Sequence, residues 1–268
     1  MEKIGLLAGV GHLPVECARA AQAMGYEVYA VGLLSGVDPE LPAAVTEYAD
    51  INVAKLGRII DHLKKHGVTK VTAIGKVSKE LLMNGRHELP DWRMVKLLLS
   101  LPDHKDDTLM LTFVAALKKE GIELVDQTLL IRPLMPAAGT LTRRAPSENE
   151  RRDMAFGFRM AKEIGRLDVG QTAVVKGMAV MALEAIEGTD ACIRRGGKLA
   201  RGGAVVVKVA KPEQDRRFDV PAVGVTTVES MIEAGATALA IEAEHTLLVD
   251  RAQTIALAEA HDITIVAM

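Results

Sequence analysis

The feature that most constrains the fold is the alternation, along the first half of the chain, of short apolar runs with longer segments of helical periodicity. The expected strands cover residues 3–8, 27–33 and 70–77, and the expected helices cover 13–24, 56–66 and 107–119. Strands that alternate with helices favour a parallel sheet with crossover connections. The first half is therefore predicted to be a Rossmann-like domain.

The second half predicts another α/β domain. Residues 133–147 are rich in Pro, Gly and small polar residues without a sustained period, which is typical of a linker. A helix is expected over 148–167, with Ser147 as its N-cap. Further strand and helix segments are expected at 172–180, 181–187, 204–210, 226–234, 238–242, 251–260 and 263–267. The predicted architecture is a domain at 1–132, a linker at 133–147 and a domain at 148–268.

Composition narrows the possible partners and compartment. The 268 residues carry a net charge of -2 and only 3% aromatic residues, which argues against a nucleic-acid partner. Cys17 and Cys192 lie far apart, so neither a disulfide framework nor a cysteine zinc site is indicated, and a reducing cytoplasm fits. No signal segment and no apolar run of membrane-spanning length are visible. We expect a cytoplasmic protein, soluble or peripheral to a membrane.

The run from Lys211 to Pro221 is the strongest candidate for a functional site. It contains six charged residues, three of each sign. Asp215 and Asp219 are four residues apart, so their carboxylates converge whether the segment is helical or extended. Converging carboxylates suit Mg²⁺, and the cations suit phosphate oxygens. The alternative is a solvated loop whose charges neutralise one another.

A glycine turn after the first expected strand is the second candidate. Gly9 and Gly11 stand where a dinucleotide fingerprint begins, but Pro14 replaces its third glycine. Such a turn still presents backbone N–H groups to a phosphate or a nucleotide hydroxyl, although it can also be a plain turn. Lys76, at the carboxyl end of an expected strand, contacts a ligand or is solvated.

The segment Gly188-Thr189-Asp190 has a structural and a functional interpretation. Gly188 is expected to end one apolar helix and Asp190 to cap the next. In the functional interpretation Asp190 meets Asp215 and Asp219 at the end of a sheet. The basic, glycine-rich segments 194–198 and 201–203 then form an anion cradle, or are merely flexible loops.

Two other polar clusters receive structural interpretations. His62 and His66 are four apart on an expected helix, but neighbouring lysines and the lack of an evident third ligand favour a solvated face. Residues 103–107 are expected to form a helix N-terminus. No nucleophile motif is present.

Several of these motifs together resemble one family. The segments are 9–14, 170–172, 184–190 and 211–221, followed by Gly224 and by Ala234-Gly235. In this order they resemble the LpxI family of UDP-2,3-diacylglucosamine pyrophosphatases, which act in lipid A biosynthesis of Gram-negative bacteria. The resemblance implies Mg²⁺-dependent hydrolysis to 2,3-diacylglucosamine 1-phosphate (lipid X) and UMP, with water directed at the β-phosphorus. It also implies that Asp219 is essential.

These considerations give a set of candidate residues. The candidate catalytic residues are Asp219, Asp215, Lys211 and Arg216. The candidate metal ligands are Asp219, Asp215 and Asp190. The candidate substrate-binding residues are Gly9, Gly11, His12, Lys76, Thr189 and Gln214.

Three expectations about partners follow. Two acyl chains require a hydrophobic chamber, because each buried CH₂ contributes about 0.8 kcal/mol. Contact with the inner membrane is expected, and a homo-oligomer is expected on general frequency. The alternatives are a nicotinamide-dependent oxidoreductase, which would need the third glycine and an acidic ribose partner, and a non-catalytic regulator that binds a nucleotide sugar.

Overall fold

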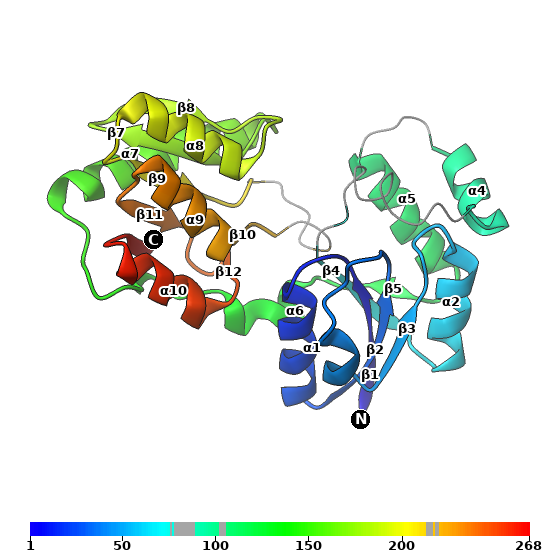
Figure 1. Cartoon of the computed structure of the whole chain (residues 1–268). Coiled ribbons are helices and arrows are strands. Elements are labelled where there is room, and N and C mark those ends of the chain that lie inside the picture. The colour runs from blue at the N-terminus through cyan, green and yellow to red at the C-terminus, as the bar shows by residue number, and fades with distance from the viewer. Residues whose placement is uncertain (76, 78–88, 102–105, 213–216, 218–219) are drawn as a thin grey trace. The chain divides into compact units, whose positions relative to one another are not determined.

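The chain folds into two compact units that divide at Ile131 and Arg132 (Figure 1). The computed structural model describes residues 1–75, 77, 89–101, 106–212, 217 and 220–268. Each unit contains its own sheet and its own hydrophobic core, so each is described by itself.

The first unit is built on a five-stranded parallel sheet of order β3-β2-β1-β4-β5. Its strands are β1 (Glu2–Ala8), β2 (Tyr26–Gly32), β3 (Glu47–Asp50), β4 (Lys70–Ile74) and β5 (Glu123–Leu124). This order is that of the doubly wound nucleotide-binding sheets, in which the chain reverses its direction of travel beside the first strand. The Rossmann-like prediction is confirmed.

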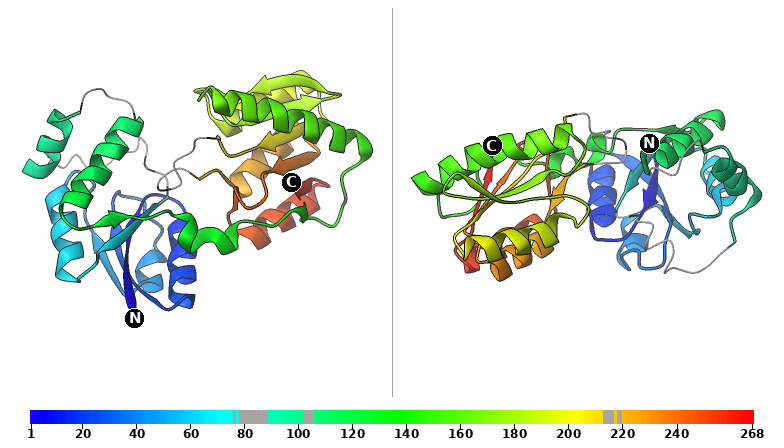
Figure 2. Two further views of the ribbon diagram at one scale, coloured as in Figure 1. Left: turned by 180° about the vertical axis from the view of Figure 1, so that it is seen from behind. Right: turned by 90° about the horizontal axis from the view of Figure 1, so that it is seen from above.

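Helices cover both faces of the first sheet (Figures 1 and 2). They are α1 (Leu13–Ala23), α2 (Leu56–Lys65), α4 (Trp92–Leu99), α5 (Asp106–Lys119) and α6 (Thr128–Ile131), with a 3-10 turn η1 at Leu41–Ala44. Leu7, Tyr29 and Val31 pack with α2, α4 and α5 in one core. The expected helices at 13–24 and 56–66 match α1 and α2 to within one residue at each end.

The second unit is built on a mixed six-stranded sheet of order β6-β13-β11-β9-β7-β8. Its strands are β6 (Gly139–Thr140), β7 (Thr172–Lys176), β8 (Ala179–Leu183), β9 (Val205–Lys208), β11 (Ala238–Ile241) and β13 (Thr264–Ala267). A separate pair is formed by β10 (Ala222–Val223) and β12 (Leu247–Leu248). Strand β6 belongs to the predicted linker, and it pairs with β13.

The helix that was expected to end at Gly188, over residues 181–187, is wrong. Residues 179–183 form strand β8, which pairs antiparallel with β7. The two strands are joined at Gly177 and Met178, both of which have positive φ values, 59° and 57°. Two successive positive φ values produce the tight turn that reverses a strand. The segment 172–180, expected to be a single strand, therefore contains strand β7, the turn and the first residues of strand β8.

Helices also cover both faces of the second sheet (Figure 2). They are α7 (Glu148–Arg166), α8 (Thr189–Ala200), α9 (Val225–Ala234) and α10 (Arg251–Ala260), with a 3-10 turn η2 at Arg132–Leu134. Val175 and Val207 pack in the core that contains α7 residues. Val174 and Val206 pack in the core that contains residues of α8, α9 and α10. The second predicted α/β domain is confirmed as a three-layer unit.

A partly buried ion pair fixes the start of α7. Ser147 and Glu150 form a capping box, as expected from Ser147, and Arg144 donates two hydrogen bonds of 3.0 Å to the Glu150 carboxylate. Burial by itself would raise the pKa of Glu150, but the hydrogen bonds from Arg144 and Ser147 outweigh it and lower the pKa from 4.5 to about 2.

Glu150→Gln should flatten the dependence of stability on pH. Because the folded state lowers the pKa of Glu150, its contribution is complete above about pH 4.5 and is lost as the pH falls towards about 2. Arg144 is partly exposed, so solvent screens the ion pair. We therefore expect the pH-dependent contribution of Glu150 to the free energy of unfolding to be about 2 kcal/mol. Urea unfolding at pH 7 and pH 3 measures the difference. Glu148→Gln, in the same turn but exposed, is the control. Equal losses of stability on acidification in wild type and Glu150→Gln would contradict this account.

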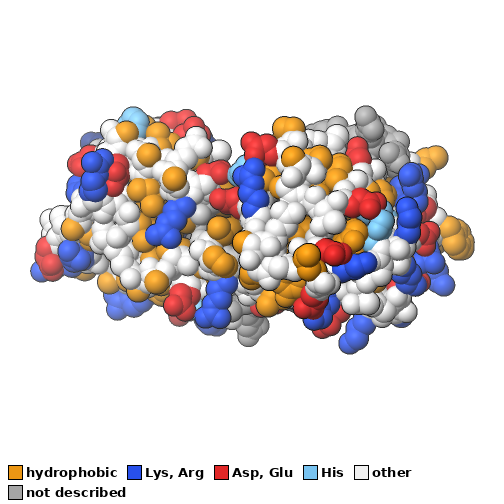
Figure 3. All heavy atoms as spheres, turned by 90° about the horizontal axis from the view of Figure 1, so that it is seen from below, with side chains coloured by type: hydrophobic (Ala, Val, Ile, Leu, Met, Phe, Trp, Pro, Cys, Tyr) orange, Lys and Arg blue, Asp and Glu red, His pale blue; other side chains and the backbone are white. Residues whose placement is uncertain are grey.

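The surface carries charges of both signs. On the face shown in Figure 3, Lys and Arg side chains are interspersed with Asp, Glu and hydrophobic side chains. None of the helices that the structure describes is long and apolar enough to cross a membrane.

Candidate functional site

The first candidate site lies at the carboxyl edge of the first sheet, between β1 and β4. The Gly9 amide donates a 2.8 Å hydrogen bond to the Ile74 carbonyl, which joins the loops that follow these two strands. A Cβ on Gly75 would lie 2.9 Å from the Gly9 carbonyl carbon, and Gly75 has a φ of 99°. Only glycine fits this approach without strain. The two loops meet at the switch point of the sheet, where ligands bind in this fold.

A histidine and an aspartate extend this site. Gly11 has a φ of 108°, and its backbone forms a bridge with Val37. His12, the residue before α1, places Nδ1 2.8 Å from Asp38 Oδ2. The backbone N–H of Glu40 and the His12 ring lower the pKa of Asp38, so its carboxylate is ionised at neutral pH. Gly9, Gly11 and His12 thus lie at one edge of the sheet with Asp38.

Asp38 was missed by sequence reasoning. A dinucleotide site places its acidic residue directly at the end of the second strand, and the residues at the end of β2 are apolar. Asp38 lies six residues beyond the last residue of β2. The bridge between Gly11 and Val37 brings it back to the glycine turn. No local sequence signal indicates this return.

The second candidate site lies at the carboxyl edge of β9 in the second unit. The Ala210 amide donates 2.8 Å to Glu242 Oε2, just before the run Lys211–Pro221 begins. At the other end of the run, the Pro221 carbonyl accepts from the Leu247 amide at 2.9 Å. Lys208 and Ala222, which flank the run, are joined by a 2.9 Å bond from Lys208 Nζ to the Ala222 carbonyl. Both ends of the run are therefore held at one edge of the sheet.

Two lysines near the start of the run have fixed partners. Lys162 of α7 donates to the Ala210 carbonyl at 2.9 Å and to Glu242 Oε1 at 2.8 Å. Lys211 Nζ lies 2.7 Å from the exposed carboxylate of Asp168. The predicted phosphate ligand Lys211 thus has an acidic neighbour that the sequence did not indicate.

A buried lysine connects the run to α8. Lys208, the last residue of β9, is only 8% exposed and donates to Thr189 Oγ1 at 3.1 Å. Thr189 in turn donates to Glu184 Oε1 at 3.0 Å. Within the described part of the chain, the hydroxyl of Thr172, which is opposite Lys208 in the sheet, is buried without a hydrogen-bond partner. This edge of the sheet therefore combines a buried cation, a helix N-terminus and an unsatisfied hydroxyl.

The caps around α8 differ from the prediction. Gly188 is the N-cap residue of α8, with a φ of 80°, and does not end a preceding helix. Asp190 is the second residue of α8, where its charge complements the helix dipole. The element before Gly188 is strand β8, so no helix ends at Gly188.

The predicted anion cradle is also wrong. Residues 194–198 lie inside α8, where Arg194 pairs with Glu233 at 2.5 Å and Arg195 pairs with Glu187. Gly196 and Gly197 are buried: a Cβ on Gly197 would lie 2.4 Å from the Cβ of Ala234. Gly197 therefore serves close packing of α8 on α9, and Gly196 serves its close packing on Val174 of strand β7. Residues 201–203 follow the far end of α8, about 16 Å along the helix from Asp190.

Some predicted site residues lie outside the described residues. They are Lys76, Gln214, Asp215, Arg216 and Asp219. Residues 103–105 of the expected helix N-terminus lie outside them as well. The assignments to these residues stay predictions.

Comparison with known proteins identifies the family. Residues 3–134 match the LpxI N-terminal domain, and residues 137–266 match the LpxI C-terminal domain. The chain belongs to the LpxI family. It is 35% identical, over 97% of its own length and 95% of the relative's, to the UDP-2,3-diacylglucosamine pyrophosphatase LpxI of Caulobacter vibrioides strain ATCC 19089 / CIP 103742 / CB 15. The resemblance seen in the motifs is confirmed for this LpxI chain.

Solved structures show weaker similarity to this LpxI chain. A UDP-glucose 4-epimerase from Stenotrophomonas maltophila is 11% identical, with a TM-score of 0.31 over 46% of this chain and 35% of the epimerase. A UDP-glucose 4-epimerase from Bifidobacterium longum is 12% identical, with a TM-score of 0.30 over 45% of this chain and 34% of the epimerase. Similarity at this level supports no conclusion about function.

Proposed function

We propose that this protein hydrolyses the pyrophosphate bond of UDP-2,3-diacylglucosamine, with 2,3-diacylglucosamine 1-phosphate and UMP as products, as a step of lipid A biosynthesis. The observation that carries the proposal is the 35% identity, over 97% of the chain, to a relative named as this pyrophosphatase. Both LpxI domains are matched, so the similarity is not confined to a shared nucleotide-binding fold.

The switch-point site of the first unit suits the nucleotide part of the substrate. Gly11 has open space where a Cβ would stand, so a phosphate or ribose oxygen can approach its backbone, while the Gly9 amide holds the turn against Ile74. Asp38 holds Nδ1 of His12 and thereby orients the ring. We assign substrate binding to this site and include Asp38 in it.

The carboxyl edge of β9 suits the diphosphate. Lys208 supplies a buried positive charge, and the N-terminus of α8 supplies backbone N–H groups and the positive end of the helix dipole. Thr189 is the first residue of α8 and is held by Lys208 and Glu184. The ends of the run that contains Asp215 and Asp219 are anchored at the same edge.

One described carboxylate close to this edge supports the proposal of a Mg²⁺ site. Asp190, which follows Thr189 in the chain, contributes a carboxylate in the first turn of α8, and Mg²⁺ prefers oxygen ligands of this kind. We propose Asp190, Asp215 and Asp219 as its protein ligands. When bound, Mg²⁺ neutralises charge on the phosphoryl oxygens. Asp219 orients the attacking water, and Lys211 and Arg216 stabilise the charge that develops.

The bond changes follow from attack at the β-phosphorus, which carries the sugar. The oxygen of water forms the new bond to this phosphorus, and the bond from it to the bridging oxygen breaks. The bridging oxygen leaves with UMP, and the protons of water pass to solvent or to a nearby base. The lipid product therefore keeps the oxygen that came from water.

We also propose that helix α4 contacts the membrane that holds the diacyl substrate. Trp92 and Leu99 are 75% and 80% exposed, while Met94 and Leu97 on the other side of the helix are buried in the core. Lys96 lies on the same short helix. Exposed Trp and Leu beside basic residues are typical of helices that lie in the membrane interface.

Replacing Trp92 and Leu99 together with alanine should weaken binding to phospholipid vesicles that contain anionic lipid by about tenfold or more. Cosedimentation measures the bound fraction. Leu167→Ala, which removes another exposed leucine, is the control and should bind as wild type does. Unchanged binding of the double variant would show that α4 is not the contact.

Release of UMP from UDP-2,3-diacylglucosamine tests the proposed function. We expect turnover with Mg²⁺, and much slower turnover of UDP-glucose, which lacks the acyl chains. Absence of UMP at enzyme concentrations equal to that of the lipid substrate would refute the proposal. Reduction or oxidation of a nicotinamide cofactor in the same mixture would support the oxidoreductase alternative.

A further inference from the structure

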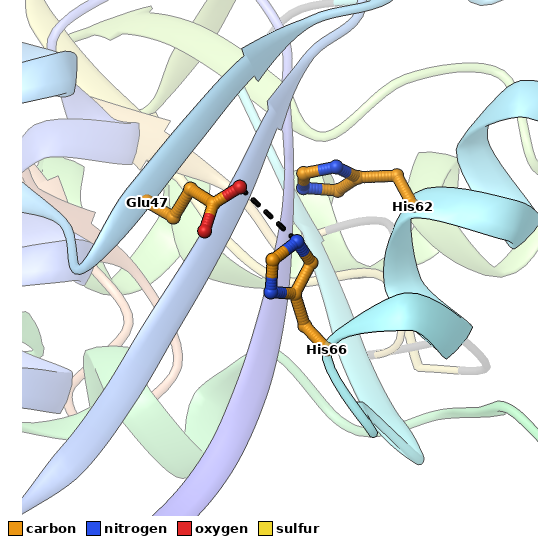
Figure 4. Close-up of side chains that lie close together, drawn as sticks. All are labelled: Glu47, His62 and His66. Atoms are coloured by element: carbon orange, nitrogen blue, oxygen red, sulfur yellow. Dashed lines mark ion pairs between the residues drawn. The ribbon is translucent and has the colours of Figure 1, made fainter.

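Three potential metal ligands come together in the first unit, away from the nucleotide site. Glu47 is the first residue of strand β3, His62 lies in the last turn of α2, and His66 is the residue that caps this helix. One ligand atom from each lies within 4.8 Å of the other two. The Glu47 and His66 side chains point toward one another, and the His62 ring lies beside them (Figure 4).

The interpretation of these histidines as a solvated face is therefore wrong. The Nε2 atoms of both His62 and His66 are buried and have no hydrogen-bond partner among the residues that the structure describes. His66 Nε2 lies 3.1 Å from Glu47 Oε1, which is an ion-pair distance without the geometry of a hydrogen bond. A buried polar atom without a partner destabilises a protein by about 1 to 3 kcal/mol. Two such atoms side by side call for a ligand.

The two rings are held in place by their surroundings. Residues four apart lie on the same face of a helix, and the ring centroids of His62 and His66 are 4.8 Å apart. Tyr29 stacks on His66 at 4.9 Å, and Lys3 donates a 2.9 Å hydrogen bond to the His66 carbonyl. These contacts orient the histidines before any ligand arrives.

Burial and neighbouring charges both act on the ring of His62. Burial lowers the pKa of His62, and the neighbouring His66 lowers it further, against the opposing effect of Glu47. Glu47, which is partly exposed, supplies a negative charge to the cluster.

We propose that Glu47, His62 and His66 bind one Zn²⁺ ion per chain. Two imidazoles and one carboxylate are an established zinc ligand set, with water completing a tetrahedron. Metal–ligand bonds of about 2.0 to 2.1 Å place ligand atoms about 3.3 Å apart. The separation of His66 from Glu47 is already near this value, and small side-chain rotations bring in His62. Imidazole ligands favour Zn²⁺ over Mg²⁺.

This site is independent of the proposed hydrolase function. Glu47 begins β3, the edge strand of the first sheet, and His66 precedes β4, whose first residue is Lys70. The cluster therefore lies towards the amino ends of the strands, whereas Gly9 and Gly75 follow their carboxyl ends. A bound Zn²⁺ would link the edge strand to α2 and stabilise the first unit by mass action.

Titration of the tag-free, full-length protein with Zn²⁺ tests the proposal. We expect one Zn²⁺ per chain by calorimetry and a higher melting temperature with Zn²⁺. His62→Gln and His66→Gln should each weaken binding by more than the roughly 10- to 100-fold caused by losing an outer-shell partner. Glu47→Gln should also weaken it. His261→Gln, which removes a histidine of the second unit, should bind as wild type does.

Binding that is equally tight in wild type and in the two histidine variants would overturn the proposal, as would wild type that binds no Zn²⁺. Circular dichroism without metal checks that the variants fold. If a variant does not fold, X-ray absorption at the zinc edge of the wild-type protein decides. Two imidazoles in the first coordination shell support the site, and scattering without imidazole contradicts it.

Discussion

Replacing Asp219 with asparagine is expected to lower turnover of UDP-2,3-diacylglucosamine by about 10³- to 10⁵-fold while the protein still folds. This range equals roughly 4 to 7 kcal/mol of transition-state stabilisation. An exposed ion pair contributes less than about 1 kcal/mol, so the catalytic and the solvated-loop interpretations predict different results. The measurement is the rate of UMP release at saturating Mg²⁺ and substrate.

Glu213→Gln is the matched control for Asp219→Asn. It removes a carboxylate from the same run, and no catalytic role is assigned to it. We expect it to retain turnover within about threefold of wild type, because the account gives this carboxylate no part in metal binding or in orienting water. If folded Asp219→Asn also stays within about threefold of wild type, the assignment of Asp219 is wrong.

Replacing Lys208 with methionine is expected to lower turnover by about 10²- to 10³-fold. Removal of one hydrogen-bond donor that stabilises charge in the transition state has an effect of this size in other enzymes. Lys208 is buried at the carboxyl edge of β9 and holds both Thr189 and the Ala222 carbonyl. Methionine keeps a similar length but removes the charge and both hydrogen bonds. The site then loses its buried cation and one anchor of the run.

The Lys208 variant also leaves polar groups without a donor, so its stability must be measured as well. We expect the melting temperature to fall, because each unsatisfied buried group costs about 1 to 3 kcal/mol. Turnover is therefore expressed per folded molecule, with KM and kcat separated. Lys198→Met, which removes an exposed lysine of α8, is the control. Normal kcat in folded Lys208→Met would restrict Lys208 to a structural role.

The first unit was predictable because local patterns determined its elements. The apolar runs of β1 and β2 end at glycines, and the helical period of α1 and α2 is unbroken, so their bounds were nearly correct. The second unit contained two misleading segments. Residues 181–187 have helical composition, but the turn at Gly177 and Met178 directs 181–183 into strand β8, and 184–187 follow that strand outside any helix.

Residues 194–198 were mistaken for a loop because glycines usually interrupt helices. In α8, Gly196 and Gly197 are required because Val174 and Ala234 approach too closely for a Cβ. This requirement depends on partners from other elements of the unit. A single sequence does not reveal it.

The candidate site was predictable only where its residues form a local sequence pattern. The run from Lys211 to Pro221 is a local signal, and its ends are held at a sheet edge where a phosphate site is expected. Asp38, Lys208 and Glu47 were missed, because their roles arise from contacts with residues distant in sequence.

Hydrolysis in ¹⁸O-labelled water tests the central claim most directly. The wild-type protein is incubated with UDP-2,3-diacylglucosamine and Mg²⁺, or with EDTA, and both products are analysed by mass spectrometry. We predict equal amounts of UMP and 2,3-diacylglucosamine 1-phosphate with Mg²⁺, the label in the lipid phosphate, and no turnover with EDTA. Label in UMP would contradict attack at the β-phosphorus, and the absence of both products would contradict the assigned function.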